Sequence, residues 1–161
     1  MARKIKKQSW GAGDLFVIET RDGLLRLGQV LGAEVSALNS AICAYSLKAW
    51  DPKVGKPTLD ENDIISVGFA TRDLLDSGGW RVVGHQNVLP FIEEFDLETR
   101  KAEGFVGTKV RGSGLVIQFL DACLGLLPWD KMFDPEYFEK LLIDPSRKPK
   151  NLIYKTNSKR H

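Results

Sequence analysis

The sequence has few of the residues on which metal sites and disulfides depend. Its 161 residues include two cysteines and two histidines. Cys43 and Cys123 lie in apolar segments without CxxC or Cys/His spacing, so we predict free, buried thiols. With His85 and the terminal His161 as the available imidazoles, neither a zinc site nor a Cys–His nucleophile pair has an obvious second partner. We therefore expect no metal ion and no cofactor.

Long hydrophobic runs are also missing. The longest, at residues 115–117 and 124–127, are far shorter than the roughly 18 residues that a membrane span needs. The basic start of the chain is followed by Gln8, Ser9, Trp10 and Gly11, which do not form the apolar region of a signal peptide. These features predict a cytoplasmic protein with no membrane partner.

The composition otherwise excludes a disordered or low-complexity chain. Hydrophobic residues make up 43% and charged residues 27%, with seven prolines. A chain of this length typically forms one domain, and no linker-like segment interrupts residues 10–144. We predict a basic N-terminal arm at residues 1–9, a single α+β domain at 10–144 and a basic C-terminal tail at 145–161.

Charge is strongly segregated along the chain. Residues 9–144 hold all 21 acidic residues against 13 basic ones, a net charge of −8, while the flanking segments contain no acid. A domain of this charge should attract a basic partner and repel nucleic acid. The basic ends are equally explained as solubilising arms.

Alternating apolar and polar residues predict a curved, mainly antiparallel sheet of five or six strands. Residues 14–20 and 24–31 flank Asp22-Gly23, which predicts a hairpin. Gly28 inside the second strand predicts a bulge or sharp bend, which favours a curled sheet and leaves a small barrel open as an alternative. Further strands are expected at residues 41–47, 63–70, 80–85 and 104–110, with a short one at 91–92.

Two or three helices are expected, mainly in the C-terminal half. A short one at residues 71–76 precedes a longer one at 115–127, although residues 115–117 alone fit a strand equally well. Asp134-Pro135-Glu136 is a typical helix start, and that helix should end before Pro145. The predicted fold class is therefore α+β.

No combination of residues has the spacing of a catalytic site. His85 with one of the carboxylates would suit a small hydrolase, but a histidine at a strand end is more often structural. Gly112-Ser113-Gly114 lacks the rest of a phosphate-binding fingerprint. We predict that the protein is not an enzyme and keep the hydrolase as the alternative.

The tryptophans suggest a second alternative, a nucleic-acid-binding β-domain. Trp10, Trp50 and Trp80 could stack on bases beside the basic ends of the chain. Stacking platforms normally lie in a positive groove, whereas the predicted domain is net negative. We therefore expect the tryptophans to pack in the core or at its rim.

Three short segments resemble motifs of the immunity protein 26 family of bacterial polymorphic toxin systems. The family has a "GD-x-F-x-I" strand, a "G-x-V-L" strand and a "G-x-W-x-V-I-G" strand. The matching residues are Gly13, Asp14, Phe16 and Ile18 in the first, Gly28, Val30 and Leu31 in the second, and Gly78 or Gly79, Trp80, Val83 and Gly84 in the third. The resemblance covers roughly residues 10–95 and implies a small cytoplasmic protein that binds and neutralises a cognate toxin without catalysis.

An acidic domain in such a family would suit a basic toxin, for example a nuclease, because carboxylates can occupy the surface that holds a nucleic acid. Two acidic segments with apolar neighbours are the candidate partner-binding residues: Asp60, Glu61 and Asp63 in one, and Phe91, Glu93, Glu94 and Phe95 in the other. In this hypothesis the acids steer the partner and a phenylalanine anchors it. The alternative places the phenylalanines in the core and leaves the acids solvated.

Overall fold

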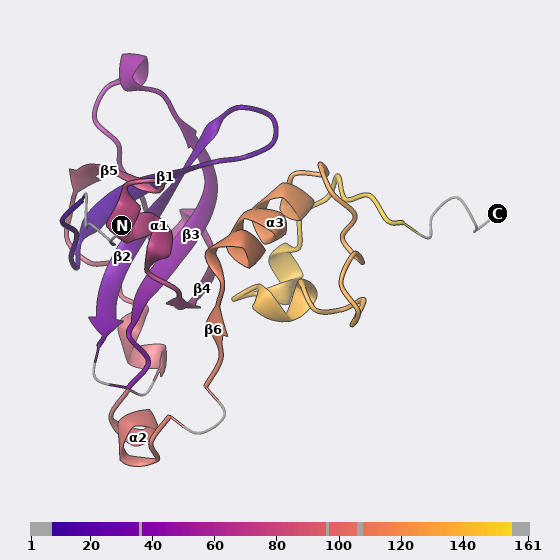
Figure 1. The fold of residues 1–161 in the computed structure, drawn as a ribbon. Helices are drawn as coiled ribbons and strands as arrows, with labels where there is room; N and C mark the ends of the chain where they lie inside the picture. The colour runs from indigo at the N-terminus through magenta and orange to yellow at the C-terminus, as the bar shows by residue number, and fades with distance from the viewer. Residues whose placement is uncertain (1–7, 36, 96, 106–107, 156–161) are drawn as a thin grey trace, which may run out of the picture.

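The computed structural model describes residues 8–35, 37–95, 97–105 and 108–155, and within them the chain forms a six-stranded sheet (Figure 1). The strands are β1 (Asp14–Glu19), β2 (Leu25–Glu34), β3 (Ser40–Trp50), β4 (Ile64–Ala70), β5 (Arg81–His85) and β6 (Val110–Arg111). Their order is β5-β1-β2-β3-β4-β6, and every neighbouring pair is antiparallel except β4 and β6, which are parallel. The predicted α+β class is confirmed, and the sheet is open rather than closed into a barrel.

The hairpin predicted at Asp22-Gly23 joins β1 to β2. Gly23 has a φ of +84°, and its N–H donates to the Thr20 carbonyl at 2.8 Å, while Thr20 N–H donates to the Leu24 carbonyl at 3.0 Å. The Asp22 carboxylate closes the loop by accepting from the Thr20 hydroxyl and from Leu24 N–H. This is a three-residue loop in which glycine alone adopts the left-handed conformation.

Gly28 creates the space in which the core aromatics pack. It lies opposite Phe16 in the β1–β2 register, and a Cβ atom at Gly28 would approach the Phe16 ring to 2.7 Å. The Phe16 ring stacks on Trp80 with centroids 5.3 Å apart, and Tyr45 meets both rings edge-on. The predicted irregularity is confirmed as well, because the β2–β3 register shifts between Arg26 and Gly28.

Side chains that alternate along the strands form one cluster on each face of the sheet. On one face Phe16, Ile18, Val30, Cys43 and Tyr45 belong to one buried cluster with residues of α3 (Ser113–Cys123) and of the turns that follow it. The other face carries a second cluster, whose buried members are Leu15, Val17, Leu27, Leu31, Ile42, Ala44, Leu59, Ile64, Phe69 and Phe91. Both cysteines are buried and free, as predicted, and burial raises the pKa of the Cys43 thiol to about 12.

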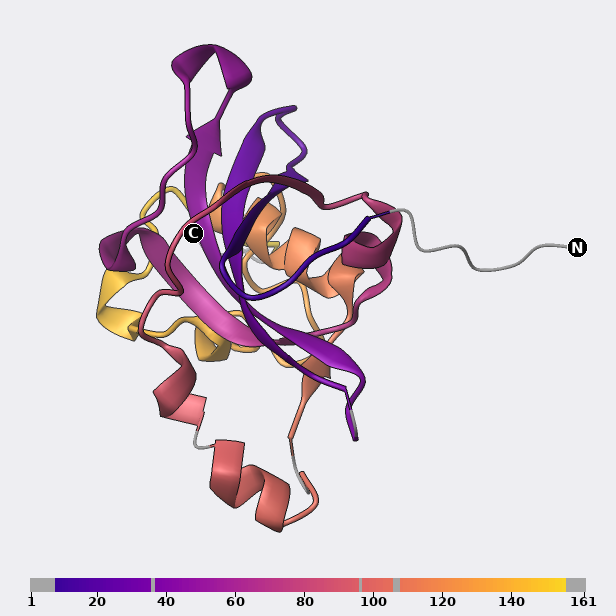
Figure 2. The ribbon, with the colours of Figure 1, turned by 90° about the vertical axis from the view of Figure 1, so that its left-hand side faces the viewer.

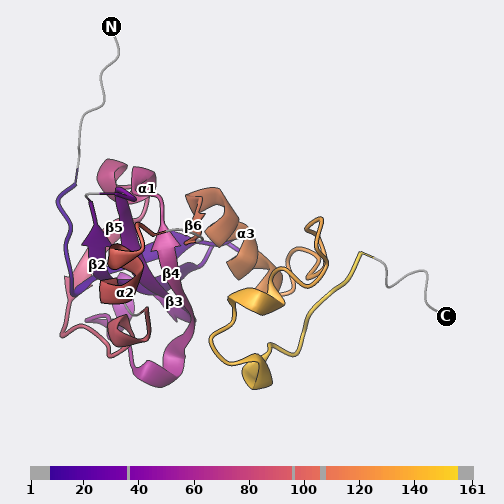
Figure 3. The same cartoon turned by 90° about the horizontal axis from the view of Figure 1, so that it is seen from below.

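The described helices are α1 (Asp73–Ser77), α2 (Leu97–Ala102) and α3 (Ser113–Cys123). Helix α3 lies beside the sheet and buries Val116, Phe119 and Leu120, as its sequence spacing predicted. Figures 1 and 3 show α3 and the C-terminal turns together on one side of the sheet. None of the described helices is both long and apolar enough to cross a membrane.

Several local predictions are wrong. No α-helix starts at Asp134: its carboxylate does accept from Glu136 N–H at 3.0 Å, but the chain continues as turns and a 3-10 helix at Glu139–Leu141. A segment this short gains few helical hydrogen bonds, and burying Phe138 and Leu142 determines its path instead. The short strand expected at residues 91–92 is a turn leading into the 3-10 helix Ile92–Phe95. Of the strand expected at 104–110, residues 106–107 lie outside the described residues and β6 begins at Val110.

The segment that follows residue 144 packs onto the domain as far as Lys155. Pro128 forms an isolated parallel bridge with Ile153, and Trp129 N–H donates to the Ile153 carbonyl at 2.7 Å. Leu152 and Tyr154 contact the first core cluster. The chain becomes basic after residue 144, but it continues to pack on the domain beyond that point. Residues 156–161 of the predicted tail lie outside the described residues.

Candidate protein-binding site

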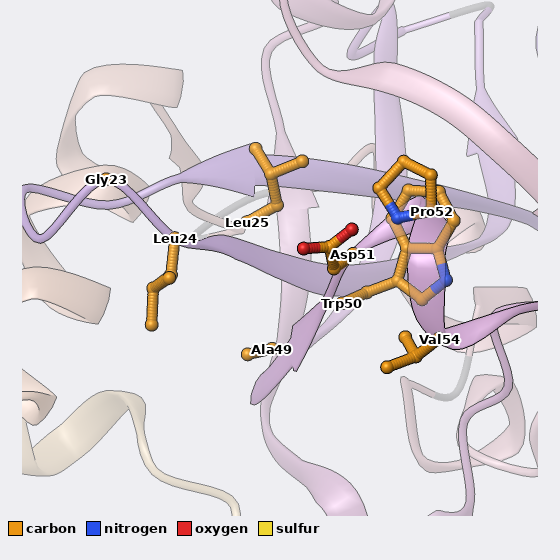
Figure 4. Close-up of a pocket in the computed structure, with 8 residues that line it drawn as sticks. All are labelled: Gly23, Leu24, Leu25, Ala49, Trp50, Asp51, Pro52 and Val54. Carbon is orange, nitrogen blue, oxygen red and sulfur yellow. The ribbon is translucent and has the colours of Figure 1, made fainter.

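An apolar groove lies where the β1–β2 loop meets the end of β3 (Figure 4). The β2–β3 register places Leu25, the first residue of β2, opposite Trp50, the last residue of β3. The groove has a volume of about 330 Å³ and is lined by Gly23, Leu24, Leu25, Ala49, Trp50, Asp51, Pro52 and Val54. Two connections far apart in sequence thus build one concave surface.

Large apolar side chains remain accessible around this groove. The exposed fraction of Leu24 is 50% and that of Val54 is 74%. Both residues lie at turns, where polar residues are more usual. Contiguous exposed apolar surface on a folded domain typically marks a binding site. The groove is therefore the best candidate for a surface that another protein covers.

The loop that carries the groove is held in place by its own hydrogen bonds. The Trp50 indole N–H donates to the Gly55 carbonyl at 2.8 Å, and the Asp51 carboxylate accepts from Lys53 N–H at 2.8 Å. Gly55, with a φ of +102°, ends the 3-10 helix Pro52–Val54. A loop that is ordered before binding loses less conformational entropy when a partner docks.

The loop from Asp51 to Asp63 connects β3 to β4, and the tip of this loop stands clear of the sheet in Figure 2. The first predicted acidic segment lies on this β3–β4 connection. Asp60 and Glu61 are exposed, and Asp63 is partly exposed and lies 3.7 Å from the Lys48 ammonium. The connection from residue 51 to 63 carries four acids and two lysines, a net charge of −2. The structure therefore places these three acids on the loop whose tip forms the apolar groove.

The second predicted segment is less accessible. Phe91 is 7% exposed and belongs to the second core cluster, which favours the core alternative for this residue. Glu93 is exposed, whereas the side chains of Glu94 and Phe95 lie outside the described part of the structure. The side chain of Gln86, which follows β5, makes hydrogen bonds of 2.9 and 3.0 Å with the Leu59 backbone of the β3–β4 connection.

His85 has the carboxylate partner that the hydrolase alternative requires. Its Nδ1 lies 2.9 Å from Asp14 Oδ1, at the register position where β5 faces β1. The other Asp14 oxygen accepts from Gly11 N–H at 2.9 Å, and the His85 side chain is 67% exposed. Neither residue lines the apolar groove, and β5, which carries His85, is an edge strand of the sheet.

The four tryptophans occupy different environments. Trp80 and Trp129 are buried, and Trp10 donates its indole N–H to Asp76 at 2.7 Å. Trp50 alone lines the apolar groove. The sequence analysis expected Trp50 in the core or at its rim, with base stacking as the alternative, and Trp50 is partly buried against the second core cluster. It did not identify Leu24 and Val54, whose signal was an apolar residue at a turn position.

The residues that resemble the immunity protein 26 motifs lie on three adjacent strands, β5, β1 and β2, or in the turns directly before β1 and β5. Among them, Gly28 leaves room for the Phe16 ring, which stacks on Trp80, so packing in the fold accounts for these three motif positions. Comparison of the chain with models of protein families, with curated proteins and with solved structures gives no match.

Proposed function

We propose that this protein is a cytoplasmic immunity protein, which neutralises a cognate bacterial toxin by binding it. The observation that carries the proposal is the apolar groove around Trp50, with exposed Leu24 and Val54, on a loop that also carries Asp60 and Glu61. Interfaces of this kind combine a desolvated aromatic anchor with charged residues at the rim. The motif resemblance of β1, β2 and β5 supports the same class of protein.

The charge of the chain favours a basic partner. The net charge of −8 over residues 9–144 attracts a positive protein surface, such as the substrate groove of a nuclease toxin. In this account Trp50 and its apolar neighbours supply the contact that slows dissociation. The acids at the base of the loop steer the partner during approach, and no catalytic step is involved.

Reversing two charges tests the steering role. The Asp60→Lys, Glu61→Lys double variant should associate with the toxin about tenfold more slowly at low salt, because the favourable long-range field is weakened. Its dissociation rate should change little. The measurement is stopped-flow or surface-plasmon kinetics, over a range of salt concentrations, with the product of the reading frame directly upstream of the gene.

Two further variants locate the effect. Glu93→Lys asks whether the second acidic segment also faces the partner, and Glu103→Lys, an exposed acid elsewhere, is the matched control. Association that slows equally in Glu103→Lys would indicate a general charge effect. Unchanged association in the Asp60→Lys, Glu61→Lys variant would remove these acids from the interface.

A small hydrolase remains the second candidate, because the His85–Asp14 pair is present at 2.9 Å. A general base of this type would need His85 for activity. An immunity protein would not, since the pair lies outside the groove.

A further inference from the structure

A second cavity lies on the opposite half of the sheet from the groove-forming hairpin, between β4, β6 and the turns of residues 137–141. Its volume is about 410 Å³, within the range of small-molecule sites. It is lined by Val67, Gly68, Phe69, Arg100, Thr108, Lys109, Arg111, Tyr137, Lys140 and Leu141.

The lining of this cavity is strongly basic. It includes four cationic side chains, Arg100, Lys109, Arg111 and Lys140, and no aspartate or glutamate. Residues 9–144 contain 13 basic residues and are net negative, so four cations around one cavity run against the charge of the domain. Lys140 is paired with Asp134 at 2.8 Å, and both side chains are substantially exposed. A concave surface of one charge concentrates ions of the opposite charge.

Arg111 is held in a fixed position at the wall of the cavity. Its Nη1 donates to Ser66 Oγ at 2.8 Å and its Nη2 donates to the Val67 carbonyl at 3.1 Å. The guanidinium lies against Gly68, where a Cβ atom would come within 2.8 Å of Cζ. Gly68 therefore makes room for this side chain.

The Arg111 side chain is only partly exposed, and among the described residues no carboxylate forms an ion pair with its guanidinium. Burial lowers its pKa from the usual value, although the group remains charged. Removing a cation from water without an opposite charge is unfavourable. An anion bound in the cavity would offset that cost.

The remaining walls add hydroxyl and apolar groups. Thr108 Oγ1 already accepts from Arg100 Nη1 at 3.1 Å, and Tyr137 contributes a second hydroxyl. Val67, Phe69 and Leu141 supply apolar surface next to the cations. The cavity is thus larger and less polar than a site for a bare ion would need to be.

We propose that this cavity binds an organic phosphate monoester, with the phosphate on Arg111 and Lys109 and the organic group against Phe69, Tyr137 and Leu141. Arginine and lysine together match a dianionic phosphate, because the guanidinium offers parallel N–H donors and the ammonium adds a point charge. The site is distinct from the proposed toxin-binding groove, and its test requires no toxin.

The test is calorimetric or NMR titration of the full chain with adenosine monophosphate, inorganic phosphate and citrate at constant ionic strength. Adenosine monophosphate should bind saturably and at least about fivefold more tightly than inorganic phosphate, because its organic group adds apolar contact. Citrate, which carries more negative charge at neutral pH but no phosphate, should bind more weakly than adenosine monophosphate.

Variants assign the binding to this cavity. Arg111→Gln should weaken adenosine monophosphate binding about tenfold or more, and Lys109→Gln about fivefold. Lys109 is exposed and serves as the second variant because Arg111→Gln also removes hydrogen bonds to β4. Lys131→Gln, at an exposed lysine that does not line the cavity, should leave the affinity unchanged. No saturable binding up to about 10 mM, equal affinity in Lys109→Gln, or citrate binding as tight as that of adenosine monophosphate would overturn the proposal.

Discussion

Replacing Trp80 by alanine is expected to lower the free energy of unfolding by about 3–5 kcal/mol, the largest loss of stability from a single change proposed for this chain. Trp80 is 1% exposed, stacks on Phe16 at 5.3 Å and meets Tyr45 edge-on at 6.1 Å. Its removal leaves a cavity in the cluster that Trp80, just before β5, forms with side chains of β1 and β3. Thermal and chemical denaturation followed by circular dichroism measure the effect.

Trp80→Phe is the matched control for this experiment. It keeps a ring against Phe16, and the Trp80 indole N–H has no acceptor among the described residues, so little hydrogen bonding is lost. The loss should be clearly smaller, on the order of 1–2 kcal/mol. Equal losses in the two variants would mean that the stacked cluster does not carry the stability assigned to it.

Replacing Trp50 by alanine is expected to speed dissociation of the proposed toxin partner about 30-fold or more, which corresponds to the 2 kcal/mol or more that a buried aromatic anchor typically contributes. Trp50 lines the groove together with exposed Leu24 and Val54. The association rate should change much less, since the charges are retained. Surface-plasmon kinetics with the upstream gene product give both rates.

Two other variants provide a second test of the groove and a control outside it. Val54→Asp changes a side chain that is 74% exposed on a turn, so it should weaken binding without loss of folding. Phe133→Ala removes a fully exposed aromatic residue that does not line the groove, and it should bind as the unchanged protein does. Weaker binding in Phe133→Ala, with Trp50→Ala and Val54→Asp unaffected, would place the interface elsewhere.

The sheet was predictable because its strands combine strong local signals. Period-two alternation, the Asp22-Gly23 turn and Gly28 all agree with the observed β1–β2 hairpin. Around Asp134 the local signals were misleading, since a good helix start precedes a segment whose path depends on burying Phe138. No sequence pattern at residues 97–102 predicted helix α2. The parallel pairing of β6 with β4 joins residues that are about 40 positions apart in the sequence, so local patterns do not predict it.

The candidate site was predictable only in part. The acidic pattern Asp60-Glu61-x-Asp63 lies on the connection that also carries part of the groove. The groove itself needs Leu24 and Trp50, which the β2–β3 register brings together. The basic cavity around Arg111 has the same origin, because Lys109 and Lys140 are 31 residues apart in the sequence and lie around one cavity through the fold. Composition reports net charge, whereas the location of each charge depends on tertiary structure.

The most direct test of the central claim is growth of bacteria that produce the upstream gene product together with this protein or its variants. Unchanged protein and His85→Ala should both restore growth, while Trp50→Ala and Val54→Asp should fail to do so at equal expression. This result would follow if the protein acts by binding through the groove and not by catalysis at His85 and Asp14. Growth that is lost in His85→Ala but retained in Trp50→Ala, with both variants folded, would contradict the account and favour the hydrolase.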